Sequence, residues 1–231
     1  MQAKTIGSIG PSRRAFLLGA ASFGGLALSG CSAMVGNRQI TVPNLLPAII
    51  SPYYLQIYGS MPEEKFPVPA VDLNKVDQRY LRTEVDDPTG EKPGTIVVET
   101  SARFLYLVQD NGTAIRYGIG IGRDGFTWSG RGSIGRKAQW PTWHPTSAMM
   151  QRQPETREFA DGMPGGLNNP LGARAMYIYR GGVDTIYRIH GTREYWSIGK
   201  AVSSGCVRLI NQDVIDLYSR VSVGTQIIVN G

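Results

Sequence analysis

Short runs of β-branched and aromatic residues, separated by glycine and proline turns, most constrain how this chain can fold. Thr95–Glu99 and Phe104–Val108 are two such runs, and Asp110-Asn111-Gly112 marks a tight turn before a third run over Ala114–Ile121. Branched side chains fit a pleated surface, and Asn-Gly sequences adopt the positive φ angles of hairpin turns. The chain contains 29 Gly and 14 Pro, which favours β-rich architecture over a helical bundle.

The last quarter of the chain continues this pattern and adds one helix. Met176–Tyr179 and Thr185–Ile189 form a second predicted hairpin that turns over Gly181-Gly182. Asn211 is the expected N-cap of a helix whose apolar side chains recur at helical spacing: Val214, Leu217, Tyr218 and Val221. A last strand is expected over Thr225–Val229. The pattern predicts one mainly β domain with one or two short helices.

A long segment between the two predicted hairpins, residues 122–174, is rich in Gly, Pro and Trp. Its turn signals predict a loop with a single short helix around Pro154–Phe159. Long loops without secondary structure are usually functional, so we expect a functional role for this one.

The N-terminus has the order of an export signal. Arg13 and Arg14 precede an uncharged apolar stretch from Ala15 to Leu28, and small residues and Cys31 follow. The stretch is shorter than the roughly 20 residues that a membrane span needs. The arginine pair resembles a twin-arginine signal, and general export remains the alternative. We therefore expect residues 1–30 to be a signal peptide and the protein to be exported to the periplasm.

Leu28-Ser29-Gly30-Cys31 resembles the lipobox of bacterial lipoproteins, in which the cysteine is diacylated and becomes the first residue after cleavage. The resemblance implies a lipid anchor at Cys31, and Ser32 behind it favours the outer membrane over the inner one. An ordinary signal peptide with a chance cysteine is the alternative. Residues 31–93, rich in Pro and mixed charge, would form a stem between this anchor and a folded domain over residues 94–231.

The formal net charge of +6 suggests an anionic partner, but part of it lies in the signal segment. Removing Lys4, Arg13 and Arg14 leaves about +3, because residues 1–30 contain no acid. Basic runs with interleaved aromatic residues are absent from the sequence, so nucleic acid is not an expected partner.

With Cys31 assigned to lipid, Cys206 is the remaining cysteine of a protein in an oxidising compartment, where a thiol without a use is rare. His190 ends a predicted strand, and Cys206 follows behind two serines and Gly205. A thiolate is a strong nucleophile, and a nearby imidazole can take its proton and hold the resulting ion pair. Gly205 lets consecutive backbone N–H groups approach a developing oxyanion. A buried structural thiol and a plain strand-end histidine are the alternatives.

Other polar residues near this segment have alternative or minor roles. Arg208 can hold a carboxylate bidentately or form a structural salt bridge. Ser204 is at most a secondary helper, and His144 is expected to be an ordinary loop residue. Two histidines and one available cysteine do not make a convincing zinc ligand set, so neither metal nor cofactor is expected.

The region around Cys206 resembles the signature of YkuD-type L,D-transpeptidases, a His-Gly pair followed by Ser-x-Gly-Cys-x-Arg. Here these residues are His190-Gly191 and Ser203-Ser204-Gly205-Cys206-Val207-Arg208. Gly130–Lys137 stands where the family has a glycine-bearing loop, and two further segments are similar: Trp143-His144-Pro145 and Asn169-Pro170-Leu171-Gly172. Many members have Thr-Pro pairs before that loop, where this chain has Trp128-Ser129-Gly130-Arg131. The resemblance covers roughly residues 93–231.

This resemblance implies a β-sandwich-like catalytic domain that transfers acyl groups between stem peptides of peptidoglycan. Cys206 would attack the carbonyl of the diamino acid at the third position of a wall tetrapeptide and expel D-Ala. His190 would act as base and then as acid, oriented by the backbone carbonyl of Gly191. Backbone N–H groups of Gly205 and Cys206 would form the oxyanion hole, and a carbapenem would acylate the same thiol.

Three functions remain compatible with the sequence. The thioester can pass to an amine, which cross-links two stem peptides or attaches a lipoprotein to the wall. Water can take it instead, which would make the protein a hydrolase that trims stem peptides or releases tethered protein. A wall-binding lipoprotein with a vestigial site is the third possibility, against which the intact Cys206 and His190 argue.

Overall fold

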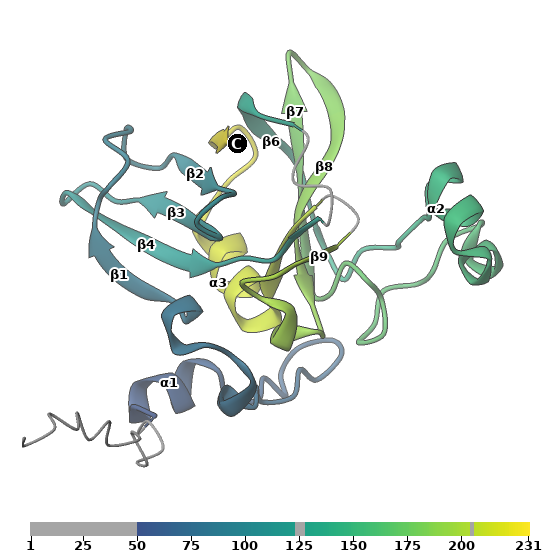
Figure 1. Ribbon diagram of the computed structural model, residues 1–231, viewed down its shortest axis with the longest axis horizontal. Coiled ribbons are helices and arrows are strands. Elements are labelled where there is room, and N and C mark those ends of the chain that lie inside the picture. The colour runs from purple at the N-terminus through teal and green to yellow at the C-terminus, as the bar shows by residue number, and fades with distance from the viewer. Residues whose placement is uncertain (1–49, 123–127, 204–205) are drawn as a thin grey trace, which may run out of the picture. The chain divides into compact units, whose positions relative to one another are not determined.

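The computed structural model describes residues 50–122, 128–203 and 206–231, and within them nine strands form one mixed sheet (Figure 1). Its strands, in spatial order, are β1 (Thr83–Asp86), β4 (Thr113–Gly118), β3 (Phe104–Val108), β2 (Ile96–Glu99), β11 (Gln226–Asn230), β6 (Gly130–Gln139), β7 (Arg174–Arg180), β8 (Val183–Thr192) and β10 (Val207–Ile210). A small second sheet pairs β5 (Ile121–Gly122) with β9 (Ala201–Ser203). The mainly β prediction is therefore confirmed.

The large sheet bends around an apolar core, with β1–β4 on one side of Figure 1, β6–β8 on the other and α3 (Asn211–Arg220) between them. Alternating side chains of both halves face inward and meet α3. Among the fully buried members are Ile96, Leu105, Ile134, Met176, Ile178, Ile189, Val207, Leu209, Val214 and Leu217. Because strand side chains alternate between faces, the residues between these apolar ones point away from this core. That outer face of β7, β8 and β10 carries the candidate site.

Most strands expected from local pattern are present with small changes in their ends. The predicted hairpin over Gly181-Gly182 is β7 and β8, and its strands are longer than expected. The helix after β10 is also present, but Asn211 is its first residue and not its N-cap. The Asn211 side chain instead accepts a hydrogen bond from the backbone N–H of Ala173 at 3.0 Å, because this buried N–H needs a partner.

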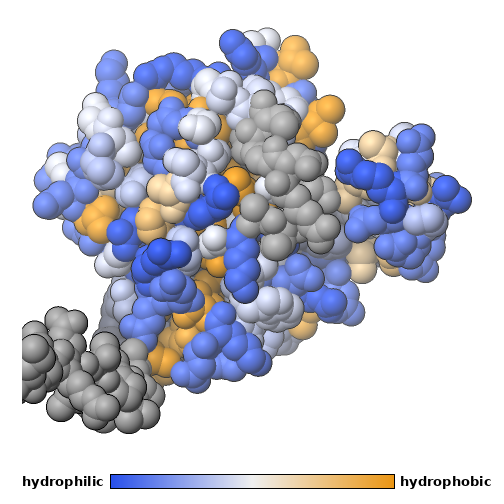
Figure 2. Space-filling view, in the orientation of Figure 1, coloured by the Kyte–Doolittle hydropathy of each residue, from blue (hydrophilic) through white to orange (hydrophobic). Residues whose placement is uncertain are grey.

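The segment 122–174 differs most from its prediction. Gly130–Lys137, expected as a loop, belongs to β6, which pairs with β11 on one side and β7 on the other. A short helix not expected from sequence, α2 (Ser147–Arg152), precedes η3 (Pro154–Phe159), which is a 3₁₀ helix. Thr146 caps α2 by accepting a hydrogen bond from the Met149 N–H. These helices project from the sheet in Figure 1, and Figure 2 shows mainly hydrophilic side chains on them.

Residues 50–82, within the predicted stem, pack on the domain through α1 (Pro52–Ile57), η1 (Leu73–Lys75) and η2 (Gln78–Tyr80). Their buried side chains form a second apolar cluster with Ile198 and Ile210. The stem and signal-peptide assignments stay predictions, and Cys31 lies outside the described residues.

Polar contacts fix the same segment to α3 and β7. The Tyr58 hydroxyl donates a hydrogen bond to the Asp213 carboxylate at 3.1 Å and accepts one from the backbone N–H of Arg82 at 2.6 Å. Glu64 forms an ion pair with Arg174 at 2.5 Å. Within the described part of the chain, no helix is long and apolar enough to cross a membrane.

Candidate active site

Strand alternation and a parallel ladder bring His190, Arg208 and Cys206 to one face of the sheet. Ile189 and Val207 are paired across β8 and β10 and both point into the core, so the next pair, His190 and Arg208, points outward. Cys206 immediately precedes β10, and the same register sets it beside Arg188. The alternation puts Cys206 on the outer face with Arg188, His190 and Arg208. The His190-Gly191 pair and the segment around Cys206 thus meet where β8 pairs with β10.

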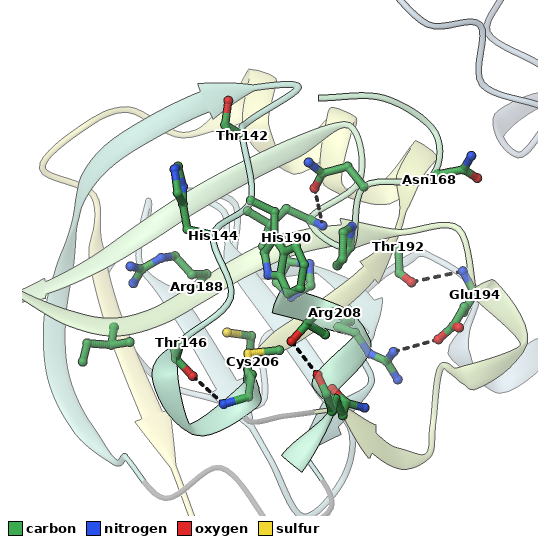
Figure 3. Close-up of a pocket in the computed structure, with 18 of the residues that line it drawn as sticks. Thr142, His144, Thr146, Asn168, Arg188, His190, Thr192, Glu194, Cys206 and Arg208 are labelled. Carbon is green, nitrogen blue, oxygen red and sulfur yellow. Dashed lines mark hydrogen bonds and ion pairs between the residues drawn. The ribbon is translucent and has the colours of Figure 1, made fainter. Parts of the chain in front are cut away.

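These side chains line a cavity of about 610 Å³, whose other wall is formed by the loop and helices between Thr142 and Thr156 (Figure 3). His144, expected to be an ordinary loop residue, is exposed in that loop and lines this cavity. Cys206 is half-buried and His190 is buried. The site is therefore a walled pocket that can enclose a peptide-sized substrate.

A backbone hydrogen bond fixes the imidazole of His190. Its Nδ1 lies 2.7 Å from the carbonyl oxygen of Gly191, which can only accept, so Nδ1 carries the proton of the neutral ring. Nε2 is then the nitrogen with an available lone pair. This is the contact that the family resemblance implies.

Gly191 has a steric reason to be glycine. A Cβ at this position would lie 2.3 Å from Oδ1 of Asn211 and 2.9 Å from a methyl group of Val214. Asn211 cannot move away easily, because its Oδ1 holds the Ala173 N–H. The first turn of α3 thus packs directly against the backbone that orients His190.

Burial and two arginines set the resting protonation of the site. The pKa of His190 is lowered to about 4, chiefly by burial and in smaller part by the positive charges of Arg208 and Arg188, while the hydrogen bond to the Gly191 carbonyl acts against the shift. Burial raises the pKa of Cys206, while the backbone and charge of Arg188 and the charge of Arg208 act in the opposite direction. Both directions favour a neutral thiol and a neutral imidazole at pH 7.

Arg208 forms a salt bridge, which is one of the two roles considered for it from sequence. Its Nη1 donates to Glu194 Oε2 at 3.2 Å, the ion pair drawn in Figure 3, and the side chain is 9% exposed. Among the described residues, its Nε and Nη2 have no hydrogen-bond partner although both are buried. Buried guanidinium donors are costly to leave unsatisfied, so Arg208 keeps donors for a further acceptor.

Ser204 and Gly205 lie outside the described residues, and so does the Gly205 half of the expected oxyanion hole. Among the described residues, no group of three or more His, Cys, Asp or Glu side chains is arranged to hold a metal ion.

Sequence reasoning missed four of the five arginines on the cavity wall, and two of these, Arg188 and Arg136, lie on strands β8 and β6 of the sheet. Arg188 lies two residues before His190, so strand alternation alone could have put both on one face. Arg136 also lines the cavity, but its strand, β6, was taken for a loop. No local signal could have joined it to the site.

Comparison with known proteins gives consistent results for the C-terminal region. The family model for YkuD, the L,D-transpeptidase catalytic domain, matches residues 93–229. The Probable L,D-transpeptidase YbiS of Escherichia coli is 36% identical over 139 residues, 58% of this chain and 43% of that protein. The Probable L,D-transpeptidase ErfK/SrfK of the same organism is 34% identical over 145 residues, 61% of this chain and 44% of that protein. The matches thus span less than half the length of these relatives.

One solved structure, from Brucella melitensis, is titled as a probable carnitine operon oxidoreductase. It is 48% identical, and the match covers 67% of this chain and 96% of that chain with a TM-score of 0.48. That TM-score establishes neither fold nor activity, and the oxidoreductase name belongs to that protein.

Proposed function

The chain belongs to the YkuD family of L,D-transpeptidase catalytic domains, and we propose that it transfers acyl groups between peptidoglycan stem peptides with Cys206 as nucleophile and His190 as base. The observation that carries the proposal is the pairing of β8 with β10. It supports a thiol and an imidazole on one cavity wall, with the imidazole held by Gly191 at 2.7 Å. A nucleophile beside an oriented base is the arrangement that covalent acyl transfer requires.

In the first half-reaction, His190 Nε2 takes the proton of the Cys206 thiol as sulfur attacks the carbonyl carbon of the third stem residue. The carbonyl oxygen becomes an oxyanion, for which the backbone N–H groups of Gly205 and Cys206 are the proposed donors. Collapse of this intermediate breaks the C–N bond to D-Ala. The leaving amine takes the proton from His190, and a thioester on Cys206 remains.

In the second half-reaction, an amine of a neighbouring stem peptide or of a lipoprotein attacks the thioester. His190 accepts a proton from this amine and returns it to the departing sulfur of Cys206. A new amide bond has then replaced the thioester, and a 3→3 cross-link or an attached lipoprotein results. The neutral resting pair suits this cycle, because the imidazole is available as a base at neutral pH.

The neighbouring guanidinium groups favour the thiolate of Cys206 and disfavour the protonated imidazole of His190. Arg188 and Arg208 both stabilise negative charge on Cys206 and disfavour positive charge on His190. We propose that they lower the cost of the thiolate during attack and hasten return of the proton from the imidazolium. Arg208 also has the two buried donors that a substrate carboxylate or oxyanion would need.

The same proposal includes a location at the cell envelope. A twin-arginine-like signal over residues 1–30 would export the chain, and diacylated Cys31 would anchor it, with the outer membrane favoured. Peptidoglycan would then lie within reach of the domain.

The test is incubation of the purified protein with disaccharide tetrapeptides, with products resolved by mass. A cross-linked dimer that has lost one D-Ala supports transpeptidation, whereas a tripeptide product would support the hydrolase. Cys206→Ala should make neither product while keeping the circular dichroism spectrum of the wild type. A Cys206→Ala variant with unchanged turnover would disprove the mechanism.

A further inference from the structure

The cavity around Cys206 carries an excess of positive charge. Its lining includes five arginines and only two acids, which are Arg136, Arg152, Arg188, Arg193, Arg208, Glu155 and Glu194. Three of these arginines have protein partners close by, since Arg208 pairs with Glu194, Arg188 pairs with Asp184, and Arg193 donates to Asn168 at 2.6 Å. A pocket with this balance selects an anionic ligand.

Arg136 and Arg188 share one aromatic ring. The register of β6, β7 and β8 aligns Arg136, Tyr177 and Arg188 on one rung of the sheet. The Arg136 guanidinium carbon lies 3.6 Å from the Tyr177 ring centroid, and that of Arg188 lies 4.5 Å from it. Cation–π contacts hold both groups in fixed positions beside the cavity.

The two arginines differ in their charge balance. Arg188 forms an ion pair with Asp184 at 2.8 Å. Arg136 is exposed, and no carboxylate of the described residues lies within ion-pairing distance of it. An anion bound at Arg136 would therefore offset the repulsion between two cations stacked on Tyr177.

The rung that carries both arginines ends at Cys206. The register of β8 and β10 sets Cys206 beside Arg188, and Tyr177 is one strand further away. Strands are spaced about 4.8 Å apart, so a group over Tyr177 lies about 10 Å from the reacting sulfur.

A donor whose diamino acid ends in a second amino-acid centre would have a carboxylate at a matching distance. Its extended side chain would place that second centre, which bears an amine and a carboxylate, about 7 Å from the reacting carbonyl carbon. A hydrogen bond of about 2.8 Å from that carboxylate extends the reach to about 10 Å from the carbonyl carbon, which is bonded to the sulfur in the thioester. The D-Ala carboxylate lies nearer the reacting carbonyl. Arg208, which is turned towards Glu194 in Figure 3, is better placed for it.

We propose that Arg136, stacked on Tyr177 beside Arg188, is a specificity-determining residue that binds the carboxylate at the far centre of the donor's diamino acid. The enzyme would thereby discriminate against wall peptides in which this carboxylate is amidated. This inference rests on the proposed function, because it requires a tetrapeptide donor acylating Cys206.

The experiment compares two tetrapeptide donors that differ only in this group, one with the carboxylate and one with the primary amide. Single-turnover release of D-Ala by the wild type measures acylation without any contribution from the acceptor. The carboxylate donor should react about tenfold faster, a ratio that a charge-assisted hydrogen bond supplies. Arg136→Gln should remove most of this preference by slowing the carboxylate donor alone, and Arg136→Lys should restore part of it.

Arg131→Gln is the matched control, because Arg131 lies on the same strand, pairs with Glu91 and is not part of the cavity lining. It should retain the wild-type preference. All three variants should react with iodoacetamide, a neutral reagent, at the wild-type rate on the Cys206 peptide.

Equal rates for both donors in the wild type would overturn the inference and leave the proposed function intact. Equal slowing of both donors by Arg136→Gln would also overturn it, since that result would assign Arg136 to the D-Ala carboxylate. A wild type that releases D-Ala from neither donor would refute the proposed function itself, and this inference with it.

Discussion

Asp213 should make the stability of the domain fall as pH rises from about 4 to 7. Its carboxyl group is fully buried in the first turn of α3. Its Oδ2 accepts a hydrogen bond from the Tyr58 hydroxyl, and its Oδ1 lies 3.8 Å from Nε of Arg82. Burial raises the pKa of Asp213 to about 7, although Arg82 and Tyr58 act against the rise. A carboxyl group whose pKa is higher in the folded chain stabilises the fold fully below its unfolded pKa. That contribution is lost as pH rises towards the folded pKa.

The size of this loss follows from the distance between the two pKa values. An ordinary aspartate and one with a pKa of about 7 differ by about 4 kcal/mol of folding free energy, which is an upper value because buried sites relax. Asp213→Asn resembles the protonated acid in shape and lacks the titration. The free energy of unfolding of this variant, relative to that of the wild type, should therefore increase by up to about 4 kcal/mol between pH 4 and pH 8.

The assay is urea denaturation followed by tryptophan fluorescence at several pH values, with the variant-minus-wild-type difference taken at each. Asp216→Asn is the matched control with the opposite sign. Burial acts to raise the pKa of Asp216, but Arg220, Tyr117 and Arg82 together lower it. This variant should lose stability at neutral pH and approach wild type in acid. A pH-independent difference for Asp213→Asn, or one that moves against the variant as pH rises, would refute the reasoning.

Three further predictions concern the site and the anchor. Gly191→Ala should destabilise the domain by about 1–3 kcal/mol in the same urea assay, because its Cβ would meet Asn211 Oδ1 at 2.3 Å. Meropenem should add one drug mass to the Cys206 peptide. The rate of adduct formation should keep rising at pH values above the ordinary pKa of a thiol, because burial raises the pKa of Cys206. An adduct rate that is flat above neutral pH would contradict this rise in the pKa. Cys31→Ala should move the protein from the membrane to the soluble periplasmic fraction, and an unmodified Cys31 in the membrane-bound wild type, detected by mass spectrometry, would disprove the anchor.

The sequence by itself determined the elements whose side-chain pattern is local. Phe104–Val108 was predicted with the ends that β3 has, because an uninterrupted run of aromatic and aliphatic residues leaves little choice. The hairpin of β7 and β8 followed from its Gly-Gly turn and its alternation. The thiol and the imidazole were found from residue chemistry and a short motif, and their common face follows from alternation once β8 and β10 are paired.

Tertiary structure alone decided the parts whose pattern has no local meaning. β6 contains three glycines and four polar residues among its first eight and reads as a loop, yet its position between β11 and β7 makes it a strand. A Cβ at Gly135 would lie 2.2 Å from the Tyr179 ring, and one at Gly132 would lie 2.6 Å from the Tyr179 carbonyl oxygen, so these glycines serve close packing. Arg136 joins the cavity only because that strand exists.

The N-terminal segment shows the same limit. Tyr58 and Asp213 are separated by 155 positions, and no sequence pattern around either residue predicts the hydrogen bond between them. Their contact depends on burial of a carboxyl group against a distant hydroxyl, which only the folded chain creates. Local side-chain periodicity can be read from a sequence because neighbours along the chain impose it. Pairing across the sheet and burial of charge cannot, because partners far along the chain decide both.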